Sequence, residues 1–160
     1  MREDLLRPSL RAAPPVVGLY SMSWSLLPCF FLGPYPVILY SALNSWRLRR
    51  PLDAFLYLLA IVGVFGVMFV THVDPLPDAV QRFKELSGTG NVAFTMLRVY
   101  AVLLWGGFYL MHRAQHRSSN MLLTSPSAWK ACLLACLLSV PLIYATGRAA
   151  AHLLVNQGLA

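Results

Sequence analysis

Charged residues are scarce in this chain, and acidic ones are the scarcest. Only 12% of the 160 residues are charged, with six acidic side chains against thirteen basic ones, whereas 58% are hydrophobic. Soluble proteins average about 25% charged and ~45–50% apolar residues. A water-soluble core could not bury that much apolar surface. The sequence therefore predicts an all-α integral membrane protein, with a single membrane domain over residues 1–160 and little room for an extramembrane catalytic domain.

Histidine and cysteine are also few. Membrane desaturases and hydroxylases need many more than the four histidines present, and three cysteines within apolar segments do not form a secreted disulfide framework. Cys132 and Cys136 share a predicted helix face and are expected to be small buried packing residues. Because no complete catalytic or metal site is recognisable, we expect no cofactor and favour a role other than catalysis.

The basic residues form small groups beside apolar runs. The formal net charge of +7 could suggest nucleic-acid binding, but that function favours one continuous basic patch. Short basic groups that border apolar runs are typical of contact with anionic lipid headgroups. We therefore expect a lipid bilayer as partner, and no nucleic acid. The expected headgroup contacts are Arg47, Arg49, Arg50, Arg113, Arg117 and Lys130.

Long apolar runs recur four times. A helix needs about 20 apolar residues to cross a bilayer. The predicted spans are residues 22–43, 52–71, 92–111 and 131–153, which together indicate a four-transmembrane-helix bundle. The polar connection over residues 72–90 contains apolar residues at helical spacing, so a short amphipathic helix on the membrane surface is predicted there.

The first predicted span contains helix-breaking residues, namely Pro28, Gly33, Pro34 and Pro36. They remove helical hydrogen bonds, and the freed carbonyls need protein or water partners because lipid offers none. This segment is therefore expected to kink or unwind, and to pack against other helices along its broken middle. A re-entrant hairpin is the alternative. If the chain crosses the membrane four times, the basic residues other than Arg98 divide equally between the two sides of the membrane. If the first segment is a hairpin, nine of them lie on one side and three on the other, which fits the positive-inside rule better.

Small residues indicate where helices approach one another. Gly63 and Gly66 narrow one side of the second predicted span. Ala131, Ala135 and Ser139 form a stripe at intervals of four residues in the last span. Small residues allow close helix packing in membranes, so both sets are predicted helix contacts.

Two features of the third predicted span are candidates for chemistry. Arg98 lies inside the span, and we expect its long side chain to reach the interface rather than to pair with Asp53. His112 and His116 are four residues apart, so one helix face could present both to a metal. Two ligands do not complete a site. The favoured interpretation is a basic helical extension that contacts lipid phosphates.

Residues 19–44 carry a motif similar to that of small bacterial multi-span inner-membrane proteins of unassigned function. The matching elements are Leu19-Tyr20-Ser21, Phe31-Leu32-Gly33-Pro34, Asn44, the basic turn Arg47 to Arg50, and Ser127-Ala128-Trp129 before the last span. Those proteins commonly have Leu-Gly after the Asn, where this chain has Leu48-Arg49. The resemblance implies a bacterial inner-membrane location and carries over no catalytic residue.

The abundance of helix-contact features predicts a structural, accessory or assembly component. Such a protein would bind other membrane-protein subunits, or a second copy of itself, through its broken first segment and small-residue stripes. The alternative is an oligomeric transporter or channel for a small solute or ion. Broken helices occur in transporters, and Arg98 would lie within the membrane.

Overall fold

A computed structural model describes residues 18–73, 77–88, 90–122 and 127–157, with side chains described except at 114–122 and 157. These residues form helices and connections without any strand, so the all-α prediction is confirmed. The elements are η1 (Met22–Ser25), α2 (Leu26–Leu32), α3 (Tyr35–Arg47), α4 (Asp53–His72), α5 (Asp78–Ser87), α6 (Val92–Leu122) and α7 (Ala128–Gln157).

Three helices are long and apolar enough to cross a membrane. Among the described residues these are Asp53–His72, Val92–Arg113 and Ala128–Asn156, which belong to α4, α6 and α7. Only 22% of each apolar window is buried inside the structure, so most side chains of these helices face outward. Outward apolar faces are expected where the surrounding solvent is hydrocarbon. The count of four membrane-spanning helices is not confirmed.

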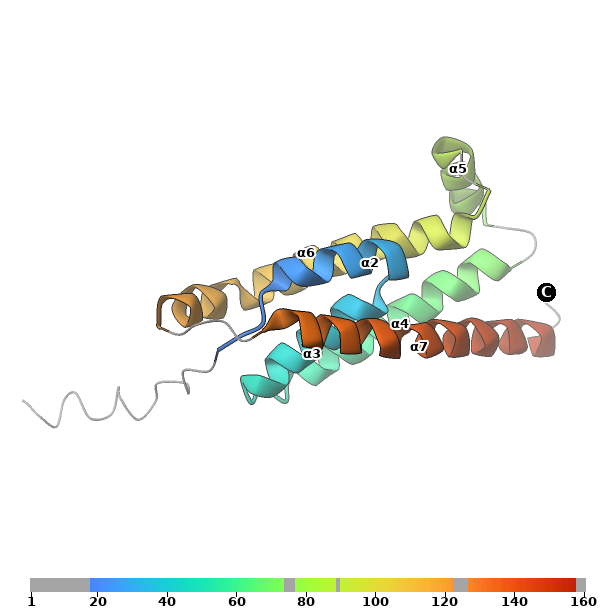
Figure 1. The fold of residues 1–160 in the computed structure, drawn as a ribbon. Helices are drawn as coiled ribbons and strands as arrows, with labels where there is room; N and C mark the ends of the chain where they lie inside the picture. Colours follow the sequence, from blue (N-terminus) through green and yellow to red (C-terminus); the bar gives the residue numbers. More distant parts are fainter. Residues whose placement is uncertain (1–17, 74–76, 89, 123–126, 158–160) are drawn as a thin grey trace, which may run out of the picture.

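Of the four predicted spans, the first is the one without a matching long helix, because residues 22–43 do not form one helix. The chain follows α6 as α2, reverses, and returns as α3 (Figure 1). Gly33 has a φ of 80°, in the left-handed region that glycine adopts without a Cβ penalty. α3 has 13 residues and α2 has 7. At ~1.5 Å per residue even α3 is only about 20 Å long, less than the ~30 Å of a hydrocarbon core.

The prolines of this segment begin its helices rather than interrupt them. Pro28 lies in the first turn of α2, and Pro34 and Pro36 flank the first residue of α3. The first turn of a helix has no intrahelical acceptors for its N–H groups, so a missing N–H costs little there. The irregularity of this segment is a reversal of the chain at Gly33, as in the hairpin alternative, rather than a kink at a proline within one helix.

Side chains from later helices satisfy the backbone at the start of the hairpin. The side-chain amide of Asn44 forms two hydrogen bonds with the backbone of Tyr20. The Tyr20 N–H donates to Asn44 Oδ1 at 2.9 Å, and Asn44 Nδ2 donates to the Tyr20 carbonyl at 3.1 Å. Other side chains donate to neighbouring carbonyls. They are Arg47 to Gly18, Tyr40 to Ser21, Trp105 to Met22 and Cys132 to Trp24. The bonds from α3 hold the beginning of the hairpin beside its end, and those from Trp105 and Cys132 attach it to α6 and α7.

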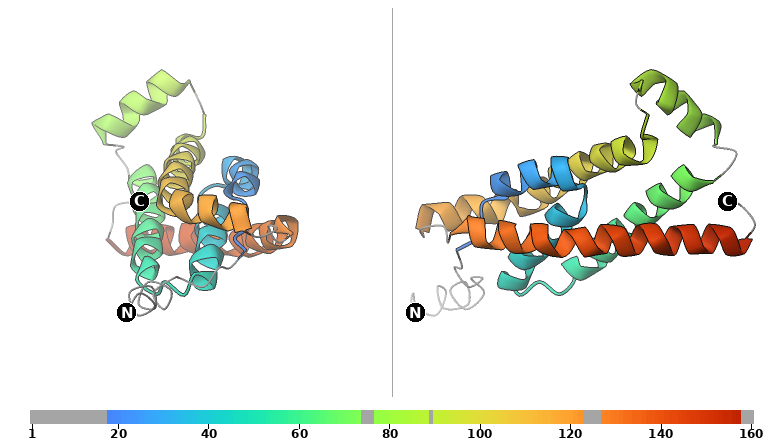
Figure 2. Two further views of the ribbon diagram at one scale, coloured as in Figure 1. Left: turned by 90° about the vertical axis from the view of Figure 1, so that its left-hand side faces the viewer. Right: turned by 45° about the vertical axis from the view of Figure 1, so that its right-hand side comes forward.

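α3 is the central helix of the fold. It packs against α2, α4, α6 and α7, and residues 34–38 at its beginning are all buried. The small residues Ala131, Ala135 and Ser139 of α7 are buried as well, and Ala135 lies beside Leu39 and Leu43 of α3. In the end-on view α3 lies at the lower edge of the bundle, with α4 beside it, α6 above it and α7 crossing behind it (Figure 2, left).

The two glycines of α4 differ in their surroundings. A Cβ on Gly63 would collide with the hydroxyl of Tyr100, which donates a hydrogen bond to the carbonyl of Ala60 at 3.1 Å. A Cβ on Gly66 would meet no atom within 4 Å. Gly63 therefore permits the contact between α4 and α6, whereas Gly66 faces open space.

Helix α5 connects α4 to α6 outside the bundle, at the end opposite the α3–α4 turn (Figures 1 and 2). It lies within the connection where a short amphipathic helix is predicted. Val80 is its one buried residue, and Gly88 ends it in a left-handed conformation. The main bundle therefore does not depend on α5 for its core.

We expect Asn44→Ala to destabilise the fold by about 1–3 kcal/mol or more. The substitution leaves the N–H and carbonyl of Tyr20 without their side-chain partner, and an unmet buried polar group has a cost of that size. Unfolding in mixed micelles of mild detergent and dodecyl sulfate measures the change. Trp46→Phe is the matched control, because Trp46 is 85% exposed and should tolerate replacement. Equal stability of the two variants would contradict the assigned role of Asn44.

Candidate functional site

A cluster of polar side chains is buried where α3, α4 and α6 meet. Ser41 and Ser45 come from α3, Tyr57 from α4 and His112 from α6, and none of them is more than 7% exposed. Asp53, the first residue of α4, lies at the margin of the cluster. Polar groups enclosed in a membrane protein need partners within the protein, because lipid offers none.

Hydrogen bonds join all five residues. His112 Nε2 lies 3.0 Å from Ser41 Oγ and 3.4 Å from the Tyr57 hydroxyl. The Tyr57 hydroxyl also contacts Ser45 Oγ and lies 3.0 Å from the Ser41 carbonyl. Ser45 Oγ donates to Asp53 Oδ2 at 2.7 Å. Hydroxyl groups thus connect an imidazole on α6 with a carboxylate on α4.

The spacing of these residues explains how the cluster forms. Ser41 and Ser45 are four residues apart on α3, and Asp53 and Tyr57 are four apart on α4. Residues at i and i+4 share a helix face. The short turn between the two helices brings these faces together. His112 completes the cluster from α6.

The cluster can link three helices and can transfer a proton through hydroxyl groups. A serine beside a histidine also resembles the pairing of a nucleophile with its base. Ser41 and His112 are both 0% exposed, however, so a substrate cannot reach either side chain in this conformation. The geometry therefore supports helix association rather than hydrolysis.

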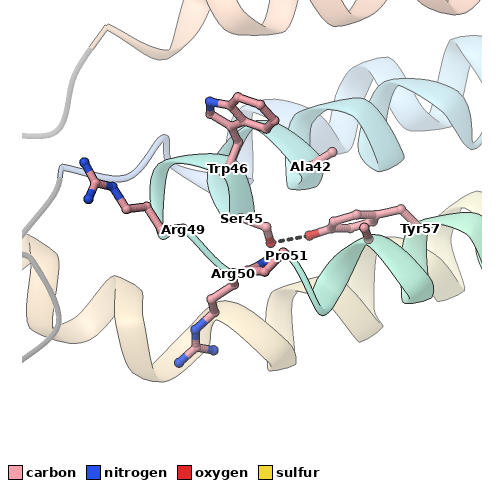
Figure 3. Close-up of a pocket in the computed structure, with 8 residues that line it drawn as sticks. Ala42, Ser45, Trp46, Arg49, Arg50, Pro51 and Tyr57 are labelled. Atoms are coloured by element: carbon pink, nitrogen blue, oxygen red, sulfur yellow. Dashed lines mark hydrogen bonds between the residues drawn. The ribbon is translucent and has the colours of Figure 1, made fainter. Parts of the chain in front are cut away.

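An open groove of about 580 Å³ lies beside the cluster, between the end of α3 and the start of α4. Its lining consists of Ala42, Ser45, Trp46, Arg49, Arg50, Pro51, Ala54 and Tyr57. Figure 3 shows Ser45 and Tyr57 pointing toward each other, with Trp46 on the opposite side of α3 from Arg50 and both arginines extending outward from the turn. The groove thus joins the buried cluster to a basic rim.

The histidine pair singled out for a metal is not assembled into such a site within the described residues. His112 points into the hydroxyl cluster, and the side chain of His116 lies outside the described residues. The part of the chain that the structure describes contains no group of three His, Cys, Asp or Glu residues close enough to hold a metal ion. The immediate neighbours of His112 Nε2 are hydroxyl oxygens instead.

Arg98 and Asp53 lie in different surroundings. The Arg98 guanidinium stacks over the ring of Phe94 at 4.0 Å and lies 5.2 Å from the ring centre of Phe30, near the tip of the hairpin. Its Nε is buried without a hydrogen-bond partner in the described part of the chain. Aromatic faces attract a cation and so provide partial compensation. Asp53 bonds instead to Ser45.

The basic residues predicted at the headgroups divide into two groups. Arg47 is partly buried: it donates to the Gly18 carbonyl at 2.9 Å and covers the ring of Tyr20 at 4.5 Å. Four of the others are exposed, and the side chain of Arg117 lies outside the described residues. The exposed ones are Arg49, Arg50, Arg113 and Lys130.

Sequence reasoning missed Ser41, Ser45 and Tyr57, and interpreted Asp53 and His112 separately. The repeated spacing of four residues was the available signal, since it places Ser41 with Ser45 and Asp53 with Tyr57 on common faces. The resemblance motif did contain Tyr20 and Asn44, which the structure joins.

No family model, curated protein or solved structure matches this chain. The fold defines a helical protein with three candidate membrane-spanning helices, a helical hairpin and a buried polar cluster.

We expect Ser45→Ala to destabilise the fold by about 1–3 kcal/mol, because it removes a hydroxyl that bonds to both Asp53 and Tyr57. Loss of helicity with rising temperature in detergent, followed by circular dichroism, measures the effect. Ser87→Ala is the control, since Ser87 lies at the end of α5 outside the bundle. An unchanged melting midpoint for Ser45→Ala would show that the cluster contributes nothing to stability.

Proposed function

We propose that this chain is a small polytopic protein of the bacterial inner membrane that acts as an accessory or assembly component. In this role it binds a transmembrane helix of another membrane protein. The observation that carries the proposal is an apolar groove of about 510 Å³ between α4 and α6, on the outside of the bundle. Its lining consists of Leu56, Leu59, Ala60, Tyr100, Leu103, Leu104, Gly107, Phe108 and Met111.

The groove suits a helix because its lining includes a glycine. A Cβ on Gly107 would meet no atom within 4 Å, and the same is true of its neighbour Gly106. Lipid chains are as apolar as leucine, so close backbone approach at small residues is what favours helix association in membranes. Leu103 and Tyr100 stand beside this opening and supply side chains against which a partner helix can pack.

The proposed topology is a re-entrant hairpin followed by three spans. The start of the hairpin, the α3–α4 turn and the start of α7 lie toward one end of the bundle (Figure 1). By their place in the sequence, nine basic residues belong to this end and three to the other. The nine are Arg2, Arg7, Arg11, Arg47, Arg49, Arg50, Arg113, Arg117 and Lys130; the three are Arg82, Lys84 and Arg148. The positive-inside rule assigns the first end to the cytoplasm.

A photo-reactive amino acid at position 103 should form protein adducts in native membranes, because Leu103 lines the groove and is 68% exposed. The same reagent at position 137 should capture lipid alone, since Leu137 is exposed on α7 outside the groove. Gly107→Leu should then reduce the adducts at position 103 severalfold without harming the fold, because the added side chain enters open space. Mass spectrometry of the products reads out the partners.

Capture of lipid alone at position 103, at native expression levels, would contradict the proposal. Adducts between two copies of the chain would instead assign the groove to self-association. Because the two positions lie on different helices, non-specific labelling would appear at both of them equally.

Transport by an oligomer is the second candidate. Arg98 favours it, since its guanidinium lies within a candidate span and faces Phe30 of the hairpin. Charged groups at such depths often mark ion or solute pathways. Three spans and a short hairpin are too few to enclose a pathway, so several copies would have to form it together.

If several copies conduct, reconstituted protein should move an ion or small solute across vesicle membranes, and Arg98→Leu should change that flux severalfold. The substitution removes the charge while retaining an apolar side chain beside Phe94. Arg82→Leu is the control, since Arg82 is exposed on α5, outside the candidate spans. Absence of flux across a broad panel of ions and solutes would exclude this second function.

A further inference from the structure

Helix α3 ends in a Schellman motif that has an arginine where glycine is usual. The N–H of Arg50 donates to the carbonyl of Ser45 at 3.1 Å, and the N–H of Arg49 donates to the carbonyl of Trp46 at 3.1 Å. These two bonds define the motif and place Arg49 at its left-handed position. Its φ is 53°, and it is the one non-glycine residue with positive φ in the described part of the chain.

A side chain at this position lowers the stability of the fold. The left-handed conformation brings Cβ close to the following carbonyl, which is why glycine is strongly preferred there. Strained residues of this kind cluster at functional sites. Arg49 is exposed, and its backbone conformation turns its side chain outward beside the groove between α3 and α4 (Figure 3).

The groove beside Arg49 combines two different surfaces. Its walls include the apolar Ala42, Pro51 and Ala54, together with the exposed ring of Trp46. Arg49 and Arg50 extend from the turn at its edge. A ligand that matches both surfaces has an anionic group and a hydrocarbon chain.

The depth of the groove is also informative. It lies at the beginning of α4, whose first residue, Asp53, starts a candidate membrane span. Trp46 and Tyr57 line the groove, and tryptophan and tyrosine are enriched at the boundary between headgroups and hydrocarbon. The nearby carboxylate of Asp53 accepts a hydrogen bond from Ser45, inside the buried cluster rather than at the basic rim.

We propose that this groove binds one anionic phospholipid. Its phosphate lies between Arg49 and Arg50, and an acyl chain follows Ala42, Trp46 and Ala54. Guanidinium groups recognise phosphate through strong charge-assisted hydrogen bonds, which a zwitterionic headgroup offsets with its own cation. The strained conformation of Arg49 persists because it brings a second cation to the headgroup.

Lipid exchange in nanodiscs tests this site through Trp46. The full chain is reconstituted into phosphatidylcholine that contains a small, increasing fraction of brominated phosphatidylglycerol, and quenching of tryptophan fluorescence is measured. Brominated phosphatidylcholine serves as the neutral comparison. Wild-type protein should prefer the anionic lipid, and Trp46→Phe should remove most of that preferential quenching because Trp46 lines the groove.

Arg49→Gly separates binding from folding. This substitution should weaken the preference for anionic lipid about fivefold, because that is the effect expected when one basic residue is lost at an anionic membrane surface. The same variant should unfold at a higher temperature in phosphatidylcholine alone, because glycine suits the left-handed position. Arg113→Gln is the matched control: it removes an exposed charge at the same end of the bundle but outside the groove lining, so it should lower the preference less than Arg49→Gly and leave the unfolding temperature unchanged.

Several results would overturn the proposal. They are equal quenching by the two brominated lipids, an equal loss of preference in Arg49→Gly and Arg113→Gln, or no gain in stability on introducing glycine. Excess inorganic phosphate should not displace the lipid, because the acyl chain contributes to binding. Complete displacement by phosphate would show that the site recognises a free anion rather than a phospholipid.

Discussion

The fold depends on the two hydrogen bonds between the Asn44 side chain and the backbone of Tyr20. A chain that enters a bilayer and turns back exposes N–H and carbonyl groups that lipid cannot satisfy. Asn44 offers one donor and one acceptor in a single planar group, and so replaces both missing partners. Because it is fully buried, it fixes the two ends of the hairpin side by side.

Helix α3 has two polar faces with different tasks. Tyr40, Asn44 and Arg47 follow one another at helical spacing and bond to the backbone of residues 18–21. Ser41 and Ser45, on the adjacent face, contact α4 and α6 through Tyr57 and His112. This polarity is directed inward, which leaves the outer surfaces of α4, α6 and α7 apolar. A partner helix is proposed to bind the outer surface between α4 and α6, and a lipid the groove between the end of α3 and the start of α4.

Some expectations depended only on local sequence. The apolar runs of α4, α6 and α7 are as long as a bilayer requires, so composition was enough to identify them. The small residues Ala131, Ala135 and Ser139 could likewise be recognised as one face by their spacing. The direction of the chain after Gly33 could not be predicted in this way. The same pattern of proline and glycine residues is compatible with either a kink or a reversal of the chain.

The sequence by itself determined that the chain is helical, which of its helices are long and apolar enough to cross a membrane, and at which charged residues each apolar run ends. These features follow from composition and from periodicity within single segments. Only the tertiary structure decided that the first segment is a hairpin and that His112 faces Ser41 and Tyr57. Both outcomes depend on contacts between residues far apart in the chain: Tyr20 lies 24 residues from Asn44, and Ser41 lies 71 from His112. Spacing along one helix gives no information about which neighbouring helix a face will meet.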